Sequence, residues 1–231
     1  MNQNHSEKTM ILACETIKDE LALAIRLTDA NFDTAWVESG LHNSPNRLRT
    51  VIQSQLEAIS GYSRVLLAFG SCGNAMAGLV TGNYELIMPK VDDCISLLIG
   101  SIAARMDFNK KGGIYFLTPG WLRGERNLWA EYCYTIEKYG EQKAERILKS
   151  MLDSYTYLGL LDTNSYDMAE IMPEIDRIAA ALKLTRTIIP ASVTYLCDLL
   201  TGPWDADRFL RVPANSEILE SDLLFIGEVT G

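Results

Sequence analysis

Three cysteines lie where an apolar run gives way to polar residues, and their positions suit a metal site. Cys14 closes "TMILAC", Cys72 lies within "FGSCGN", and Cys94 follows two aspartates after "YELIMPKV". His42 follows the apolar run that ends near Val37. Three thiolates and one imidazole form a ligand set that zinc binds with tetrahedral geometry. We therefore expect Cys14, Cys72, Cys94 and His42 to form a Cys3His metal site.

Two other chemistries fit the same residues. Three thiolates can hold three irons of a four-iron cluster and leave the fourth iron open. Alternatively, Cys72 at a helix N-terminus is a metal-free nucleophile, with His42 as its base. The plain structural alternative is that each cysteine packs as a small apolar residue in the core.

Residues around these cysteines are candidates for contact with a bound ligand. The turn "GSCGN" can expose backbone amides, although it matches neither the P-loop nor GxGxxG. The turn "LTPGW" adds an aromatic edge that can form the wall of a pocket. The predicted cofactor-binding residues are Gly70, Ser71, Gly73, Asn74, Thr118, Gly120 and Trp121.

The elements that position these residues alternate along the chain. Continuously apolar runs are separated by segments of helical periodicity, which predicts an α/β fold with a mostly parallel, Rossmann-like sheet flanked by helices. Ligands bind beyond the carboxyl ends of strands in such sheets. We also expect a short helix from about Asn74 and one helix over "DDCISLLIGSIAARM".

The sequence is compatible with two domain organisations. A polar break, "DFNKKGG", predicts a first α/β half over residues 1–108, carrying the Cys and His loops, and a second over residues 109–231. The alternative is one continuous domain with a sheet of about seven strands.

Composition excludes several classes of function. The 231 residues carry a net charge of −9, which disfavours binding to nucleic acid or to anionic membranes. No apolar run reaches the roughly 18–20 residues that span a bilayer, and the N-terminus lacks the basic start of a secretory signal. We expect a cytoplasmic protein with reduced thiols. Of its five cysteines, Cys133 and Cys197 lie in helical apolar patterns. We therefore expect these two side chains to have a structural role in packing and no role in the site.

Several segments resemble a known family. Similarity to the uncharacterised bacterial and archaeal family called domain of unknown function 1638 lies in the segments "LACET", "LHNSPNRLR", "LLAFGSCGNAMAGL", "PKVDDCISLLIGS", "IYFLTPGWL", "EKYGEQKAERILKSML" and "GPWDADRFL". The family pattern has cysteines at the positions of Cys14, Cys72 and Cys94 and a histidine at that of His42, which implies a shared site. Its members occur in archaea and anaerobic bacteria, often ones rich in corrinoid methyl-transfer systems, although this chain has no corrinoid-binding DxHxxG motif.

These observations predict a metal–thiolate protein. The first expectation is an enzyme whose metal activates a thiol or similar small substrate, in one-carbon, corrinoid-linked metabolism such as methyl transfer. The alternatives are a non-catalytic protein that binds a metal or a corrinoid, and a metal-free cysteine enzyme. The expected partners are a small-molecule ligand and a corrinoid protein, and a homo-oligomer is compatible with the sequence.

Overall fold

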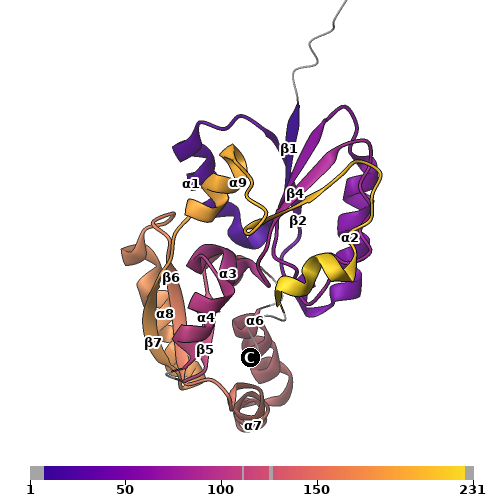
Figure 1. The fold of residues 1–231 in the computed structure, drawn as a ribbon. Coiled ribbons are helices and arrows are strands. Elements are labelled where there is room, and N and C mark those ends of the chain that lie inside the picture. Colours follow the sequence, from indigo (N-terminus) through magenta and orange to yellow (C-terminus); the bar gives the residue numbers. More distant parts are fainter. Residues whose placement is uncertain (1–7, 111, 125–126, 227–231) are drawn as a thin grey trace, which may run out of the picture.

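The first of two sheets contains the strands that carry the three cysteines. The computed structural model describes residues 8–110, 112–124 and 127–226. Its first sheet has the order β2-β1-β3-β4-β8, in which β8 alone runs antiparallel (Figure 1). The strands are β1 (Thr9–Cys14), β2 (Asp33–Val37), β3 (Arg64–Ala68), β4 (Glu85–Pro89) and β8 (Phe209–Val212).

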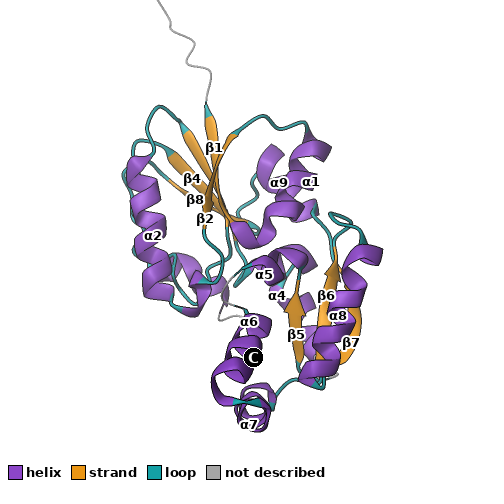
Figure 2. Cartoon of the chain, turned by 180° about the vertical axis from the view of Figure 1, so that it is seen from behind, coloured by secondary structure: helices purple, strands orange, loops and turns teal. Residues whose placement is uncertain are grey.

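Helices cover both faces of this sheet. Helices α1 (Lys18–Thr28) and α9 (Thr194–Thr201) lie on one face, and α2 (Pro45–Ala58) lies on the other (Figure 2). The central strands β1, β3 and β4 are buried almost throughout, which explains why they read as continuous apolar runs.

The second sheet is smaller and wholly parallel. It contains β5 (Ile114–Leu117), β6 (Tyr157–Asp162) and β7 (Thr185–Pro190), in that order. Helix α8 (Met168–Leu182) covers one face and contains Pro173. Between β5 and β6 lie α5 (Pro119–Arg123), α6 (Leu128–Tyr139) and α7 (Glu141–Leu152), and the last two meet at Gly140.

The carboxyl ends of the two sheets face each other (Figure 2). Thr118, at the end of β5, donates a hydrogen bond to the carbonyl oxygen of Thr16, just beyond β1, at 3.4 Å. Thr163, at the end of β6, donates one to Glu20 at 3.3 Å. Residues that follow β1, β3, β4 and β5 are therefore brought to one region of the molecule.

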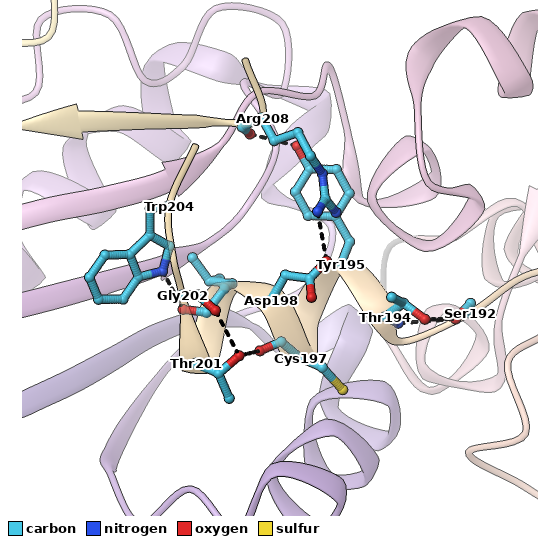
Figure 3. Close-up of polar contacts among 10 residues, drawn as sticks. Ser192, Thr194, Tyr195, Cys197, Asp198, Thr201, Gly202, Trp204 and Arg208 are labelled. Atoms are coloured by element: carbon cyan, nitrogen blue, oxygen red, sulfur yellow. Dashed lines mark hydrogen bonds and ion pairs between the residues drawn. The ribbon is translucent and has the colours of Figure 1, made fainter. Parts of the chain in front are cut away.

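The chain returns from the second sheet to the first. Figure 3 shows how α9 is fixed to the segment that leads into β8: the Tyr195 hydroxyl donates to the carbonyl oxygen of Arg208 at 2.6 Å, and the Arg208 guanidinium pairs with Asp198 at 2.7 Å. After β8, a strap is held to residues 78–81 by backbone hydrogen bonds and ends in the helical turn η3 (Glu220–Ile226), yellow in Figure 1.

This architecture confirms the predicted α/β, Rossmann-like fold with its mostly parallel sheet. The described strands form two sheets, which separate between β4 and β5, while α9 and β8 rejoin the first sheet. No described helix is long and apolar enough to cross a bilayer.

Two predicted helices differ from the structure. The segment after Cys72 forms turns up to Gly78, because Cys72, Gly73 and Asn74 all adopt left-handed backbone angles that a helix excludes. The expected helix over residues 92–106 is two helices, α3 (Cys94–Ile99) and α4 (Ile102–Asn109). They separate at Gly100, whose φ is 103°.

Candidate functional site

A cavity of about 690 Å³ opens at the carboxyl ends of the first sheet. Its lining comes from the ends of β1 and β2, the helical turn η2 (Leu41–Asn43), α2, the loops after β3 and β4, α5, and η3. Of the predicted site residues, it contains Cys14, His42, Ser71, Cys72, Gly73, Asn74, Cys94 and Trp121. Gly70, Thr118 and Gly120 lie outside this lining.

The three cysteines converge at this cavity. Cys14 is the last residue of β1, Cys72 lies in the turn after β3, and Cys94 is the first residue of α3. Their exposed fractions are 8%, 8% and 6%, so all three are buried side chains that still touch the cavity. The Cys94 thiol interacts with the thiols of both Cys14 and Cys72. Sulfurs from a strand end, a turn and a helix start thus form one group.

Their mutual contact shapes the acidity of the thiols. The hydrogen bond with the Cys94 thiol, followed by burial, raises the pKa of Cys14 well above its ordinary value. For Cys94, the interaction with the Cys14 thiol lowers the pKa, but the interaction with the Cys72 thiol and burial raise it, so the net direction is upward. The Cys14 thiol also donates to the Thr16 hydroxyl at 3.1 Å.

The loop that carries Cys72 is anchored by backbone contacts. The amide of Ser71 donates to the carbonyl oxygen of Val91 at 2.9 Å, and the amide of Cys72 donates to that of Asp92 at 2.7 Å. Gly70 makes this approach possible, because a Cβ at that position would lie 2.6 Å from the Cα of Asp93. The glycine thus joins the Cys72 loop to the Cys94 loop.

Arg49 of α2 holds the same loop from the other side. Its guanidinium donates to the carbonyl oxygen of Asn74 at 2.9 Å and to that of Ala75 at 3.3 Å. Cys72 has a backbone φ of 47°, which is a strained conformation for any residue other than glycine. Such strain is maintained when surrounding contacts fix the backbone, and it is concentrated at functional sites.

The two aspartates before Cys94 stabilise the local structure through a helix cap and ion pairs. Asp93 caps α3 by accepting a hydrogen bond from the amide of Ser96 at 2.8 Å. Arg105 pairs with Asp92 and, at 3.3 Å, with Asp93. Burial, followed by the neighbouring Asp92 charge, raises the pKa of Asp93.

His42 lies against Trp121. The two ring centroids are 4.8 Å apart and the planes are tilted by 49°. Burial lowers the pKa of His42, which favours the neutral imidazole. Among the described residues, His42 forms no hydrogen bond to a thiol or to a carboxylate that would orient it as a base.

The three predicted residues outside the lining have local structural contacts. Thr118 caps α5 by accepting from the amide of Trp121, and it is buried. Gly120 packs against the backbone of Thr16, and Gly70 against that of Asp93. They position the cavity wall without contributing to its surface.

The donor set has the chemistry of a soft-metal site, since thiolates favour zinc or iron–sulfur centres over hard cations. In the described part of the chain, no group of three or more His, Cys, Asp and Glu side chains is already arranged to hold an ion. Binding by Cys14, Cys72 and Cys94 therefore requires the loops to close around the ion and stays a prediction, as does the His42 ligand.

Sequence reasoning missed one wall of the cavity. Glu220, Leu223 and Leu224 of η3 line it, and nothing in their local pattern signals this, because the strap places them there through long-range contacts. Thr16, the acceptor for Cys14, was also missed. Cys133 is exposed on α6, which contradicts the expected packing of this side chain, and Cys197 is partly buried.

Comparison with curated proteins and with solved structures gave no match. A family model described as "Protein of unknown function (DUF1638)" matches residues 36–200. That range includes His42, Cys72, Cys94 and Trp121, whereas Cys14 and η3 lie outside it. Because the match covers more than half of the chain, the protein belongs to the DUF1638 family.

Proposed function

We propose that this is a metal–thiolate protein that holds a soft metal through Cys14, Cys72 and Cys94 at the edge of a ligand-binding cavity. The observation that carries the proposal is the convergence of three buried thiols, from three strand ends, on one cavity. Zinc is the first expectation, and an iron–sulfur cluster is the alternative.

The surroundings of the thiols support binding beside them. Phe69, Leu48 and Leu223 are buried apolar residues of the lining, and Trp121 adds an aromatic wall. Such a cavity excludes water from a small ligand and orients it toward the thiols. His42 is positioned within the same lining, so either it or the ligand can complete the coordination.

A bound metal would act as a Lewis acid toward a thiol or similar small substrate. This chain would then bind the substrate in the apolar cavity and shield it from solvent. We place this activity in one-carbon, corrinoid-linked metabolism, with a corrinoid protein as a partner. A non-catalytic role in carrying a metal or a corrinoid is the second candidate, supported by the same cavity.

The decisive experiment measures metal in protein purified without oxygen. We expect a stoichiometric soft metal in the wild type and its loss in Cys72→Ser. The matched controls are Cys133→Ser and Cys197→Ser, because neither side chain lines the cavity. Circular dichroism and thermal unfolding verify that each variant is folded.

Two results would overturn the proposal. Wild-type protein that neither retains nor takes up zinc or iron would exclude a metal–thiolate site. Unchanged metal content in a folded Cys72→Ser variant would show that other residues hold the ion. In the first case, stoichiometric alkylation of Cys72 that depends on His42 would favour the metal-free cysteine enzyme.

A further inference from the structure

The charges that line the cavity are of one sign. Four carboxylates, Glu38, Asp92, Asp93 and Glu220, contribute to the described lining, and no lysine or arginine does. Arg105 compensates the two aspartates through its ion pairs. Glu38 and Glu220 are exposed and form no ion pair among the described residues. The solvent side of the cavity therefore carries uncompensated negative charge.

Several of the groups that could bind an anion already bond within the protein. The amides of Ser71 and Cys72 donate to the carbonyl oxygens of Val91 and Asp92, so they are directed away from a ligand. Arg49, the basic residue nearest the turn along α2, donates to the backbone of Asn74 and Ala75. Two amide donors of the predicted anion-binding turn are thus already used within the protein, and a phosphate or carboxylate ligand would meet repulsion from Glu38 and Glu220.

The remaining surface is apolar and aromatic. The lining also contains Trp121, and its aliphatic and aromatic contacts are completed by Leu41, Leu48, Phe69, Leu223 and Leu224. A volume of about 690 Å³ lies within the usual range for pockets that bind small organic molecules. The face of a tryptophan ring attracts cations as well as apolar groups.

We propose that the cavity binds a small organic cation with an apolar body, such as an amine that is protonated at neutral pH. The apolar part packs against the leucines and Phe69, and the positive charge lies on the side of Glu38 and Glu220. This inference takes the location of the site from the proposed function, but it does not require that a metal be present.

The test uses three probes that share one apolar body: 4-phenylbutylamine, 4-phenylbutanol and 4-phenylbutyrate. We expect the amine to bind most tightly and the carboxylate most weakly in calorimetric titrations of the full chain at neutral pH. The amine should bind roughly fivefold or more tightly than the alcohol, as expected for partly exposed charge pairs. Equal binding of all three probes, or tightest binding of the carboxylate, would overturn the proposal.

Variants locate the charge preference. Glu38→Gln combined with Glu220→Gln should remove most of the gap between amine and alcohol while leaving alcohol binding unchanged. Glu137→Gln, an exposed change on α6 outside the lining, is the matched control. An unchanged gap in the double variant would contradict the assignment to these two carboxylates.

Repeating the titrations with chelator-treated protein separates this inference from the proposed function. A preserved preference for the amine in protein that never binds metal supports the cation site and refutes the metal site. Metal binding without any preference for the amine supports the metal site and refutes the cation site.

Discussion

Gly120 lies so close to Thr16 that a Cβ on the glycine would be 2.1 Å from the Thr16 carbonyl oxygen. Thr16 accepts a hydrogen bond from the Cys14 thiol, and Trp121 follows Gly120 in the cavity wall. The contact therefore joins the loop after β5 to the loop after β1. A residue in the smaller sheet's half of the molecule thus controls where the Cys14 end of the cavity lies.

This contact predicts a large effect of Gly120→Ala. The added methyl group must displace either the α5 backbone or the Thr16 backbone, so we expect a loss of about 2–3 kcal/mol in the free energy of unfolding. Gly61→Ala is the control, because its Cβ meets no atom within 4 Å and reports only the cost of a φ of +81°, about 1 kcal/mol. Urea denaturation measures both. Equal losses in the two variants would mean that the α5 contact adapts freely.

Glu20 predicts an unusual dependence of stability on pH. Its side chain is fully buried, and Oε1 accepts hydrogen bonds from Thr163 and Ser165 while Oε2 has no partner among the described residues. Burial is the main cause that raises the pKa of Glu20 from 4.5 to about 7. The folded protein therefore retains a proton that the unfolded chain has already released across this interval.

Because the folded state binds more protons than the unfolded state, this group makes the free energy of unfolding fall as the pH rises from about 4.5 to about 7. Full ionisation removes up to about 3 kcal/mol. Glu20→Gln should flatten this part of the profile and be the more stable protein at pH values above 7. Denaturation of both proteins across this range is the measurement, with the exposed Glu170→Gln as control. A wild-type profile parallel to that of Glu20→Gln would refute the buried proton.

The strand ends could be predicted from the sequence, whereas contacts between distant segments could not. Cys14, Cys72 and Cys94 follow continuously apolar runs, and these runs are buried central strands, so their placement at one end of a sheet follows from the pattern. The helix expected from Asn74 is absent because Cys72, Gly73 and Asn74 adopt left-handed backbone angles. The turn that they form is fixed by amide hydrogen bonds to the loop after β4, a partner that local periodicity cannot reveal.

The C-terminal wall illustrates the same limit. β8 is a short antiparallel edge strand in which only the first and last residues are buried, and the strap after it depends on pairing with residues 78–81. Leu223 is 3% exposed only because this strap carries it to the cavity. Neither the pairing nor the wall has a signature in the composition of the segment.

Arg49 should control how accessible Cys72 is. In Arg49→Ala, the carbonyl oxygens of Asn74 and Ala75 lose their donor, so the turn opens more often and the Cys72 thiol is exposed more of the time. We expect alkylation of Cys72 in metal-free protein to become several-fold faster. Arg47→Ala is a matched control, since Arg47 is an exposed residue of the same helix. Peptide mapping by mass spectrometry after timed exposure to iodoacetamide gives the rates. Unchanged Cys72 labelling in Arg49→Ala would show that other contacts alone hold the turn.

The substitution Cys72→Gly tests whether the Cys72 thiol is needed for metal binding or for the stability of its loop. Cys72 has a φ of 47°, which glycine adopts without strain. Relief of this strain offsets the greater freedom of glycine in the unfolded chain, so we expect a free energy of unfolding within about 1 kcal/mol of the wild type. Metal binding should nevertheless be lost, because the substitution removes a ligand. Denaturation together with metal analysis tests both expectations, and Cys197→Ala should retain metal. A Cys72→Gly protein that unfolds under native conditions would identify this cysteine as a packing residue, whereas a folded variant with full metal content would exclude it as a ligand.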